Sequence, residues 1–269
     1  MREGRPAQRP PRRKRFGQHF LHDPAVIERI VRSVSPRPSD HLVEIGPGRG
    51  ALTRHLLAVP DATVDAIEID RDLGARLRPL FTDTARCQLH EADALEFDFA
   101  ALARERGGPL RVIGNLPYNI STPLLFYLLA RSRALLDLHV MLQREVVARL
   151  AAQPGSKEYG RLTVMLSPGF EVERLFDIGP GAFSPPPRVW SAVVRLSPRS
   201  TPRFAVSPHF AAVVAAAFSQ RRKTLRNALS AFLTREQISA CDIDPGARPE
   251  TLTPEAFNTL AQTLDRAGP

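Results

Sequence analysis

Residues 41–51 read HLVEIGPGRGA, an apolar run that leads directly into a glycine-rich turn. The run His41–Ile45 predicts a buried strand, and Ala51–Ala58 predicts the helix that follows it. Glycines at a strand-to-helix turn let the backbone approach a ligand closely. The stretch therefore predicts a cofactor-binding turn at the carboxyl edge of a parallel sheet.

Outward from this turn, apolar strands and helical segments alternate along the chain. Repeated β-α units of this length are typical of a parallel, doubly wound sheet. We therefore predict an α/β fold of the Rossmann-like class. The predicted strands are Thr63–Ile69, Cys87–His90, Leu110–Ile113 and Leu136–Leu142, and the predicted helices are Arg71–Leu80, Phe99–Arg104, Pro123–Leu129 and Arg144–Ala151.

The pattern changes in the second half of the chain, where apolar segments follow one another without long helices between them. We predict strands at Leu162–Leu166, Glu171–Phe176 and Val189–Leu196, at least one of them antiparallel, and then helices at Phe210–Phe218, at Thr224–Phe232 and from Thr253 onward. We predict three segments: a disordered basic tail over residues 1–15, a cofactor-binding domain over residues 16–199 and a small helical domain over residues 200–269.

The net charge of +9 is concentrated in two clusters. Residues 1–15 hold seven basic residues against one acidic residue, and the second cluster comprises Arg221, Arg222, Lys223 and Arg226. Two basic patches on an otherwise balanced chain indicate a polyanionic partner. The alternative is a solvated tail and an exposed helix face.

Targeting and redox signals are absent from the sequence. No apolar run is long enough to span a membrane, and the N-terminus lacks the apolar core of a signal peptide. The two cysteines, Cys87 and Cys241, lie far apart and without metal-ligand spacing. We therefore expect a cytoplasmic protein with no metal centre, no disulfide framework and no membrane partner.

The glycine turn alone leaves two cofactors open. It matches the dinucleotide fingerprint G-x-G-x-x-A, and Glu68 lies about 20 residues further on, as in nicotinamide-dependent dehydrogenases. Three acids at successive strand ends favour S-adenosyl-L-methionine instead. Glu44 directly precedes the turn, where a dinucleotide would bring its anionic pyrophosphate. Glu68 can accept both ribose hydroxyls, and Asp93 can accept a hydrogen bond from the adenine amino group.

A second turn, GNLPYN at residues 114–119, follows the predicted strand Leu110–Ile113. Such a turn can position a weak nucleophile for methyl transfer. The amine of adenine is one, because its lone pair is delocalised into the ring. The side-chain oxygen of Asn115 and the carbonyl of Pro117 can accept the two amine hydrogens and aim the lone pair at a methyl group. Tyr118 can stack on the base. We therefore predict a catalytic turn that works by positioning, with these three residues as its members.

Together these motifs resemble the ribosomal RNA adenine dimethyltransferases of the small-subunit type. The resemblance covers roughly residues 13–264 and implies a Rossmann-like class I methyltransferase domain followed by a small helical, RNA-binding domain over residues 200–269. Beyond the two turns it rests on RFGQHFL at 15–21, EID at 68–70, DA at 93–94, KEYGRL at 157–162, FSPPPRV at 183–189 and FSQRRKT at 218–224.

The resemblance also implies roles for individual residues. The family usually has Asn at the position of His19, so the chain departs from the family pattern there. Phe183 would stack on a flipped base opposite Tyr118. The implied cofactor contacts are His19, Leu21, Gly46, Glu68, Asp93 and Asn115, and the implied RNA contacts include Arg221, Arg222 and Lys223.

The implied reaction is N6,N6-dimethylation of two adjacent adenosines near the 3′ end of small-subunit ribosomal RNA, as a late step in assembly of the 30S particle. We expect the enzyme to act as a monomer. Two alternatives stay open: a large-subunit RNA methyltransferase of the antibiotic-resistance type, and an assembly factor whose binding matters more than its methylation.

Overall fold

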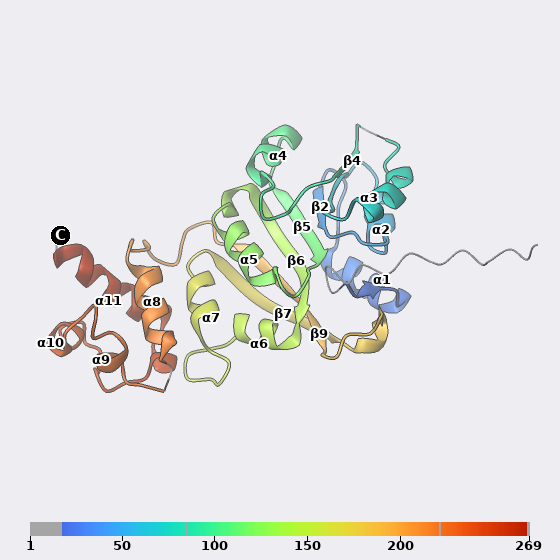
Figure 1. Cartoon of the computed structure of the whole chain (residues 1–269). Helices are drawn as coiled ribbons and strands as arrows, with labels where there is room; N and C mark the ends of the chain where they lie inside the picture. Colours follow the sequence, from blue (N-terminus) through green and yellow to red (C-terminus); the bar gives the residue numbers. More distant parts are fainter. Residues whose placement is uncertain (1–17, 84, 221, 268–269) are drawn as a thin grey trace, which may run out of the picture.

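The computed structural model describes residues 18–83, 85–220 and 222–267, and Figure 1 shows their arrangement. The predicted tail over residues 1–15 and the predicted RNA contact Arg221 lie outside these residues. Within them, no helix is both long and apolar enough to cross a membrane.

The centre of the molecule is a seven-stranded sheet in the order β4-β3-β2-β5-β6-β9-β7. Strands β2 to β6 run parallel, whereas β9 pairs antiparallel with both β6 and β7. The order runs outward in both directions from β2 and β5, so the sheet is doubly wound, as predicted. The strands are β2 (His41–Ile45), β3 (Thr63–Ile67), β4 (Cys87–His90), β5 (Leu110–Asn115), β6 (Leu135–Gln143), β7 (Phe170–Ile178) and β9 (Ser191–Pro198).

Helices cover both faces of this sheet. Successive residues of a strand point to opposite faces, and apolar side chains on both faces must be buried. In β2, Val43 and Ile45 belong to the core shared with α4, α5 and α6, and Leu42 belongs to the core shared with α1 and the α2 segment. The helices are α1 (Pro24–Val34), α2 (Thr53–Leu57), α3 (Arg71–Leu77), α4 (Phe99–Arg106), α5 (Ser121–Leu129), α6 (Arg144–Leu150), α7 (Arg161–Leu166), α8 (Phe210–Ser219), α9 (Leu225–Ala228), α10 (Arg235–Ser239) and α11 (Pro254–Ala267).

Ion pairs close the amino end of the sheet. The buried guanidinium of Arg111, on β5, donates to the carboxylates of Asp40 and Asp137 and to the carbonyls of Val34 and Ser35 at the end of α1. A buried arginine is tolerated only when its donors are paired in this way. The opposite, carboxyl edge carries the cofactor-binding turn.

The prediction of a strand at Leu162–Leu166 is wrong. This segment forms helix α7, whose N-cap residue Gly160 donates its N–H to the hydroxyl of Thr163. Leu166 packs into the core beneath the sheet and Val164 into the core of the C-terminal helices. A short segment that is buried on two sides has a continuous apolar run, which does not separate helix from strand.

The C-terminal helices α8 to α11 gather at one end of the molecule, at the left in Figure 1. Their core also includes Tyr159 and Val164, from before residue 200. The Tyr159 hydroxyl donates to the carbonyl of Leu252 at 2.7 Å. The predicted helix Thr224–Phe232 is shorter than expected, because α9 ends at Ala228 and turns follow it.

Candidate active site

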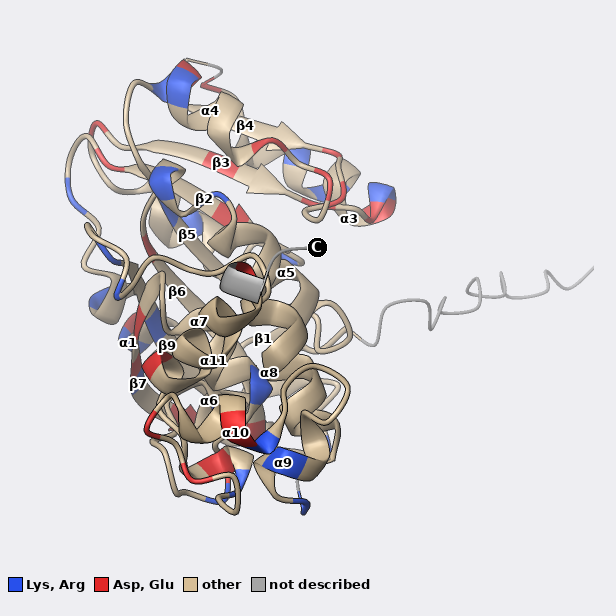
Figure 2. Ribbon diagram, turned by 90° about the vertical axis from the view of Figure 1, so that its left-hand side faces the viewer, with Lys and Arg blue, Asp and Glu red and all other residues tan. Residues whose placement is uncertain are grey.

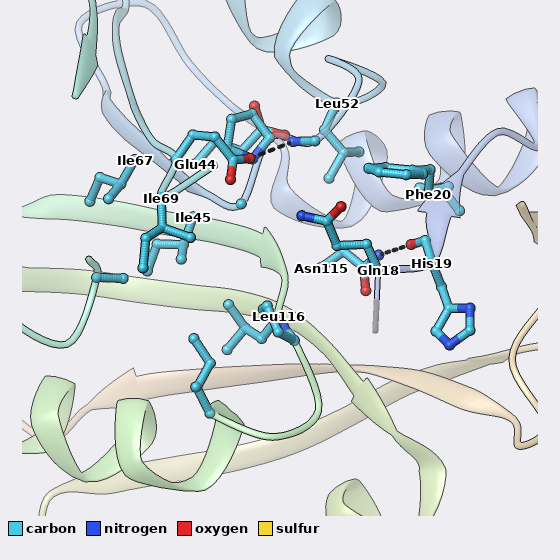
Figure 3. Close-up of a pocket in the computed structure, with 18 of the residues that line it drawn as sticks. Gln18, His19, Phe20, Glu44, Ile45, Leu52, Ile67, Ile69, Asn115 and Leu116 are labelled. Carbon is cyan, nitrogen blue, oxygen red and sulfur yellow. Dashed lines mark hydrogen bonds between the residues drawn. The ribbon is translucent and has the colours of Figure 1, made fainter. Parts of the chain in front are cut away.

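A cavity of about 240 Å³ opens at the carboxyl ends of β2, β3, β4 and β5. Parallel strands bring their carboxyl ends to one edge, which is where doubly wound sheets bind ligands. The structure brings eight of the predicted site residues together in the wall of this cavity: His19, Leu21, Gly46, Glu68, Asp93, Asn115, Pro117 and Tyr118. Figure 3 shows part of this wall.

The glycine turn after β2 needs a backbone that only glycine adopts without strain. Gly46 has φ +69° and Gly48 has φ +60°, both in the left-handed region. A Cβ on Gly48 would lie 3.1 Å from the ring of Phe20, and one on Gly46 would lie 3.8 Å from the carbonyl oxygen of Asn115. The missing side chains therefore leave space between the turn, the N-terminal segment and the second predicted turn.

Glu68 fixes the position of this turn. Its carboxylate accepts the N–H of Gly48 at 3.2 Å and the N–H of Asp70 at 3.0 Å. Burial raises the pKa of Glu68, although these two N–H groups oppose the rise. The carboxylate thus joins the end of β3 to the end of β2 across the wall of the cavity.

Glu44 lies at the base of the cavity and is 2% exposed. The hydroxyl of Thr53 donates to its carboxylate at 2.6 Å. Burial raises the pKa of Glu44 to about 7; the Thr53 hydrogen bond lowers it, and the nearby charge of Glu68 raises it further. At neutral pH this carboxyl group is therefore poised to respond to a cationic ligand.

We predict that the free energy of unfolding depends on the ionisation of Glu44. Because its folded-state pKa is raised, its stabilising contribution is fully present below the unfolded value of about 4.5 and is lost as pH rises through about 7. The wild-type protein should lose of the order of 3 kcal/mol across this window relative to Glu44→Gln. Urea unfolding of both proteins at several pH values measures the difference, and parallel curves for the two would contradict it.

Asp93 lies half-buried after β4, where its Oδ1 accepts the N–H of Leu95 at 2.9 Å. This hydrogen bond holds the turn and fixes the orientation of the carboxylate. A carboxylate has further acceptor capacity, so the group can hold its own turn and still accept a hydrogen bond from a ligand in the cavity.

The Asn115 amide is held in one orientation. Its Nδ2 donates to the carbonyl oxygen of His19 at 2.9 Å, one of the bonds drawn in Figure 3. Because that carbonyl can only accept, the amide nitrogen must face it, and Oδ1 is the atom left to accept a hydrogen from a ligand. The carbonyl of Pro117 accepts the N–H of Ile120 at 3.1 Å and has a second lone pair for another donor.

The ring of Tyr118 is anchored through its hydroxyl. The hydroxyl lies 2.9 Å from Ser191 Oγ, on the first residue of β9. The ring of His19 lies with its centroid 6.0 Å from that of Tyr118, and its Nδ1 is 2.7 Å from the carbonyl of Pro185. Tyr118 is thus oriented by contacts from both sides of the cavity.

A short strand pair, of which only the first strand lines the cavity, was not predicted. β1 (Phe20–Leu21) pairs antiparallel with β8 (Phe183–Ser184). Phe20 lines the cavity and packs under the guanidinium of Arg49, which lies 4.4 Å from the ring centroid. The sequence holds no local sign of this pair, because its strands have two residues each and lie far apart in the chain.

The remaining predicted RNA-contact residues lie outside the cavity. Phe183 is only 2% exposed and packs in the core beside α1. Base stacking by Phe183, which the resemblance implies, would require this ring to leave the core and stays a prediction. Arg222 and Lys223 are exposed in the turn between α8 and α9. Figure 2 shows basic residues around α9 in this part of the molecule.

A doubly wound sheet, a glycine turn with acids at successive strand ends and a fixed Asn-Leu-Pro-Tyr turn together define a methyltransferase of the Rossmann-like class. The family described as "Ribosomal RNA adenine dimethylase" matches residues 11–266. The chain belongs to this family, as the sequence motifs predicted.

Relatives and solved structures agree with this placement. Ribosomal RNA small subunit methyltransferase A of Pseudomonas aeruginosa is 53% identical over 259 residues, which cover 94% of each chain. The protein of the same name from Methylococcus capsulatus is 52% identical, with 94% of this chain and 98% of that protein covered.

Two solved structures share the fold. The structure of the 23S rRNA methyltransferase ErmE has a TM-score of 0.70 at 26% identity and covers 91% of this chain and 99% of its own. A dimethyladenosine transferase from Plasmodium falciparum has a TM-score of 0.78 at 23% identity, with 93% and 98% covered. The second likeness concerns the fold alone.

Proposed function

We propose that this enzyme uses S-adenosyl-L-methionine to dimethylate the N6 amines of two adjacent adenosines near the 3′ end of small-subunit (16S) ribosomal RNA, in a partly assembled 30S particle. The observation that carries the proposal is the fixed amide of Asn115 in the cavity wall, whose nitrogen is bound to the His19 carbonyl and whose oxygen is therefore the atom left to accept. Full-length relatives at about 50% identity, named as small-subunit RNA methyltransferases, support the substrate.

The cavity fits S-adenosyl-L-methionine in the chemistry of its donors. When bound, this cofactor supplies an electrophilic methyl group on a cationic sulfur. Glu44, Glu68 and Asp93 present carboxylates from the ends of three strands, and these suit a cationic amino acid, ribose hydroxyls and an adenine amine. Three carboxylates are a poor match for the pyrophosphate of a nicotinamide dinucleotide, which the turn alone left open.

The target amine is positioned by the second turn. In the first transfer Asn115 Oδ1 and the Pro117 carbonyl accept the two amine hydrogens, and the methylated amine then loses one of them to solvent as a proton. One hydrogen is left for these acceptors in the second transfer, after which it is lost in the same way. The anchored ring of Tyr118 supports the base. These contacts favour the pyramidal amine whose lone pair points at the methyl group. The amide of Asn115 is neutral, so it accepts a hydrogen bond without placing a full negative charge beside the positively charged sulfur. The turn can therefore orient the nucleophile without stabilising the positive charge of the cofactor. Positioning supplies most of the rate enhancement in such a site.

RNA binding is assigned to the exposed turn between α8 and α9. Reversing two charges there, with Arg222→Glu and Lys223→Glu, should weaken RNA binding and flatten its salt dependence. Each phosphate that the protein no longer neutralises lowers the magnitude of the slope of log K against log salt by about 0.9, the value for a duplex. Filter binding at several salt concentrations measures the slope.

The matched control reverses two exposed arginines elsewhere, Arg76 on α3 and Arg104 on α4. It changes the net charge by the same amount and should leave the salt slope near that of the wild type. If both double variants have the same salt slope, the turn between α8 and α9 is an exposed surface that does not bind RNA.

The proposed function is tested by mass spectrometry of ribosomal RNA from cells with and without the gene. We expect two adjacent N6,N6-dimethyladenosines in small-subunit RNA only when the gene is present. Loss of a mark in large-subunit RNA would support the ErmE-like alternative. An unchanged RNA, with delayed subunit assembly, would support an assembly factor.

A further inference from the structure

Trp190 is the only tryptophan of the chain, and its residue is 49% exposed. It lies directly before β9, at the end of an exposed loop whose neighbouring residue Val189 is 42% exposed. A Cβ on Gly179 would lie 3.7 Å from the indole, so the bare backbone of Gly179 lets the ring rest close to β7. The exposed face of the indole is open to a stacked base.

A guanidinium lies beside this ring. The N–H of Arg144 donates to the carbonyl of Trp190 at 2.9 Å, and the Arg144 Cζ lies 5.8 Å from the indole centroid. The Arg144 side chain is 54% exposed, and its Nη1 is 4.0 Å from the carboxylate of Asp177. The surface therefore offers a flat aromatic face and a solvated cation next to each other.

This pair is continuous with the active site on one side. Ser191, the residue after Trp190, holds the hydroxyl of Tyr118 at 2.9 Å. Trp190 therefore lies one residue from the side chain that anchors Tyr118, and RNA that leaves the cavity toward the start of β9 passes close to it.

On the other side, Arg144 forms part of the wall of a second cavity of about 1020 Å³. This groove begins at Thr122, just after the catalytic turn, and basic side chains predominate among its charged lining residues. They include Arg149, Arg161 and Arg174, against Glu145 and Glu158. The positive charge suits a phosphate backbone that leads away from the site.

We propose that Trp190 stacks on the base of a nucleotide that flanks the target adenosines, and that Arg144 binds the adjoining phosphate at the entrance of the groove. This proposal rests on the proposed function, since it needs an RNA substrate. Proteins recognise unpaired RNA by stacking bases on aromatic rings, and such stacking tolerates any base. Trp190 is then a positioning residue, which sets how the strand crosses the mouth of the cavity.

The single tryptophan makes the test direct, because all indole fluorescence comes from this residue. The full-length protein is titrated with a single-stranded oligoadenosine RNA that carries a distant dye. Dye anisotropy reports binding, and indole emission reports stacking. We expect quenching of the emission that follows the binding curve. Arg144→Gln should lower the salt slope of binding by about 0.7, the value for one phosphate contact on a single strand.

Steady-state methylation of immature small-subunit particles is the second readout. Trp190→Ala should raise KM for the particle roughly 5- to 150-fold, the range for removal of one stacked base, with kcat and cofactor affinity unchanged. Trp190→Phe, which keeps an aromatic face, should recover most of this effect. Val189→Ala, an equally exposed neighbour without a ring, should behave as the wild type.

Three outcomes overturn the proposal: RNA binds without changing indole emission, Trp190→Ala leaves KM unchanged, or purified small-subunit ribosomal proteins quench the emission while RNA does not. The last outcome would assign Trp190 to a protein contact. If the wild type itself fails to methylate the particle, the proposed function is at fault. If the wild type methylates the particle but RNA leaves the indole emission unchanged and Trp190→Ala leaves KM unchanged, only the stacking role of Trp190 is wrong.

Discussion

Asn115→Ala should lower the rate of methyl transfer by about 100-fold or more at saturating cofactor, because a site that works by orientation loses its aimed acceptor. The substitution removes both the hydrogen bond to the His19 carbonyl and the Oδ1 that we propose as the acceptor. It leaves the exposed basic turn at Arg222 and Lys223 intact, so the particle should still bind. Single-turnover methylation and particle binding, measured on the same preparation, separate the two effects.

Two further variants sharpen this prediction. Asn115→Asp keeps the shape, but its carboxylate cannot donate to the His19 carbonyl, so it should lose nearly as much activity as Asn115→Ala. Asn119→Ala removes an exposed amide from the same turn, which also lines the cavity but has no proposed role as an acceptor, and should lose far less. Undiminished dimethylation by Asn115→Ala would refute its assignment as a catalytic residue.

Glu68→Ala should weaken S-adenosyl-L-methionine binding by roughly 1.5–3 kcal/mol, the range for a hydrogen bond to a charged group. The carboxylate is proposed to accept the ribose hydroxyls, and it also holds the N–H of Gly48 in the glycine turn. Calorimetry measures the change in affinity, and the wild type should show no binding of a nicotinamide dinucleotide in the same experiment.

Glu91→Ala is the matched control for Glu68→Ala. Glu91 directly follows β4 and pairs with Arg78, outside the cavity wall. Its removal should leave cofactor affinity unchanged. Equal affinity of Glu68→Ala and the wild type would place the cofactor elsewhere, and dinucleotide binding without S-adenosyl-L-methionine binding would overturn the choice of cofactor.

The sequence was sufficient to predict the sheet and the carboxylates at its edge. Strand periodicity located β2 to β6 within a few residues, and parallel strands place Glu44, Glu68 and Asp93 at a common edge whatever the details of packing. The same rule placed Asn115 opposite the glycine turn. These positions depend on local pattern and on a general property of parallel sheets.

Long-range contacts were beyond the reach of local pattern. The bond between Tyr118 and Ser191 joins residues 73 apart, and the pairing of β1 with β8 joins Phe20 to Ser184. Helix α7 differs from the predicted strand because its apolar residues serve two cores at once. The burial of Phe183 likewise follows from packing against α1, which its own motif does not encode. The domain boundary near residue 200 stays a prediction.

The choice of RNA substrate is tested by incubating the purified protein with S-adenosyl-L-methionine and both immature ribosomal subunits in one reaction, followed by mass spectrometry of each RNA. We expect N6,N6-dimethylation of two adjacent adenosines near the 3′ end of the small-subunit RNA, and none in the large-subunit RNA. Methylation confined to the large-subunit RNA, or no methyl transfer to either particle by protein that binds the cofactor, would contradict this expectation.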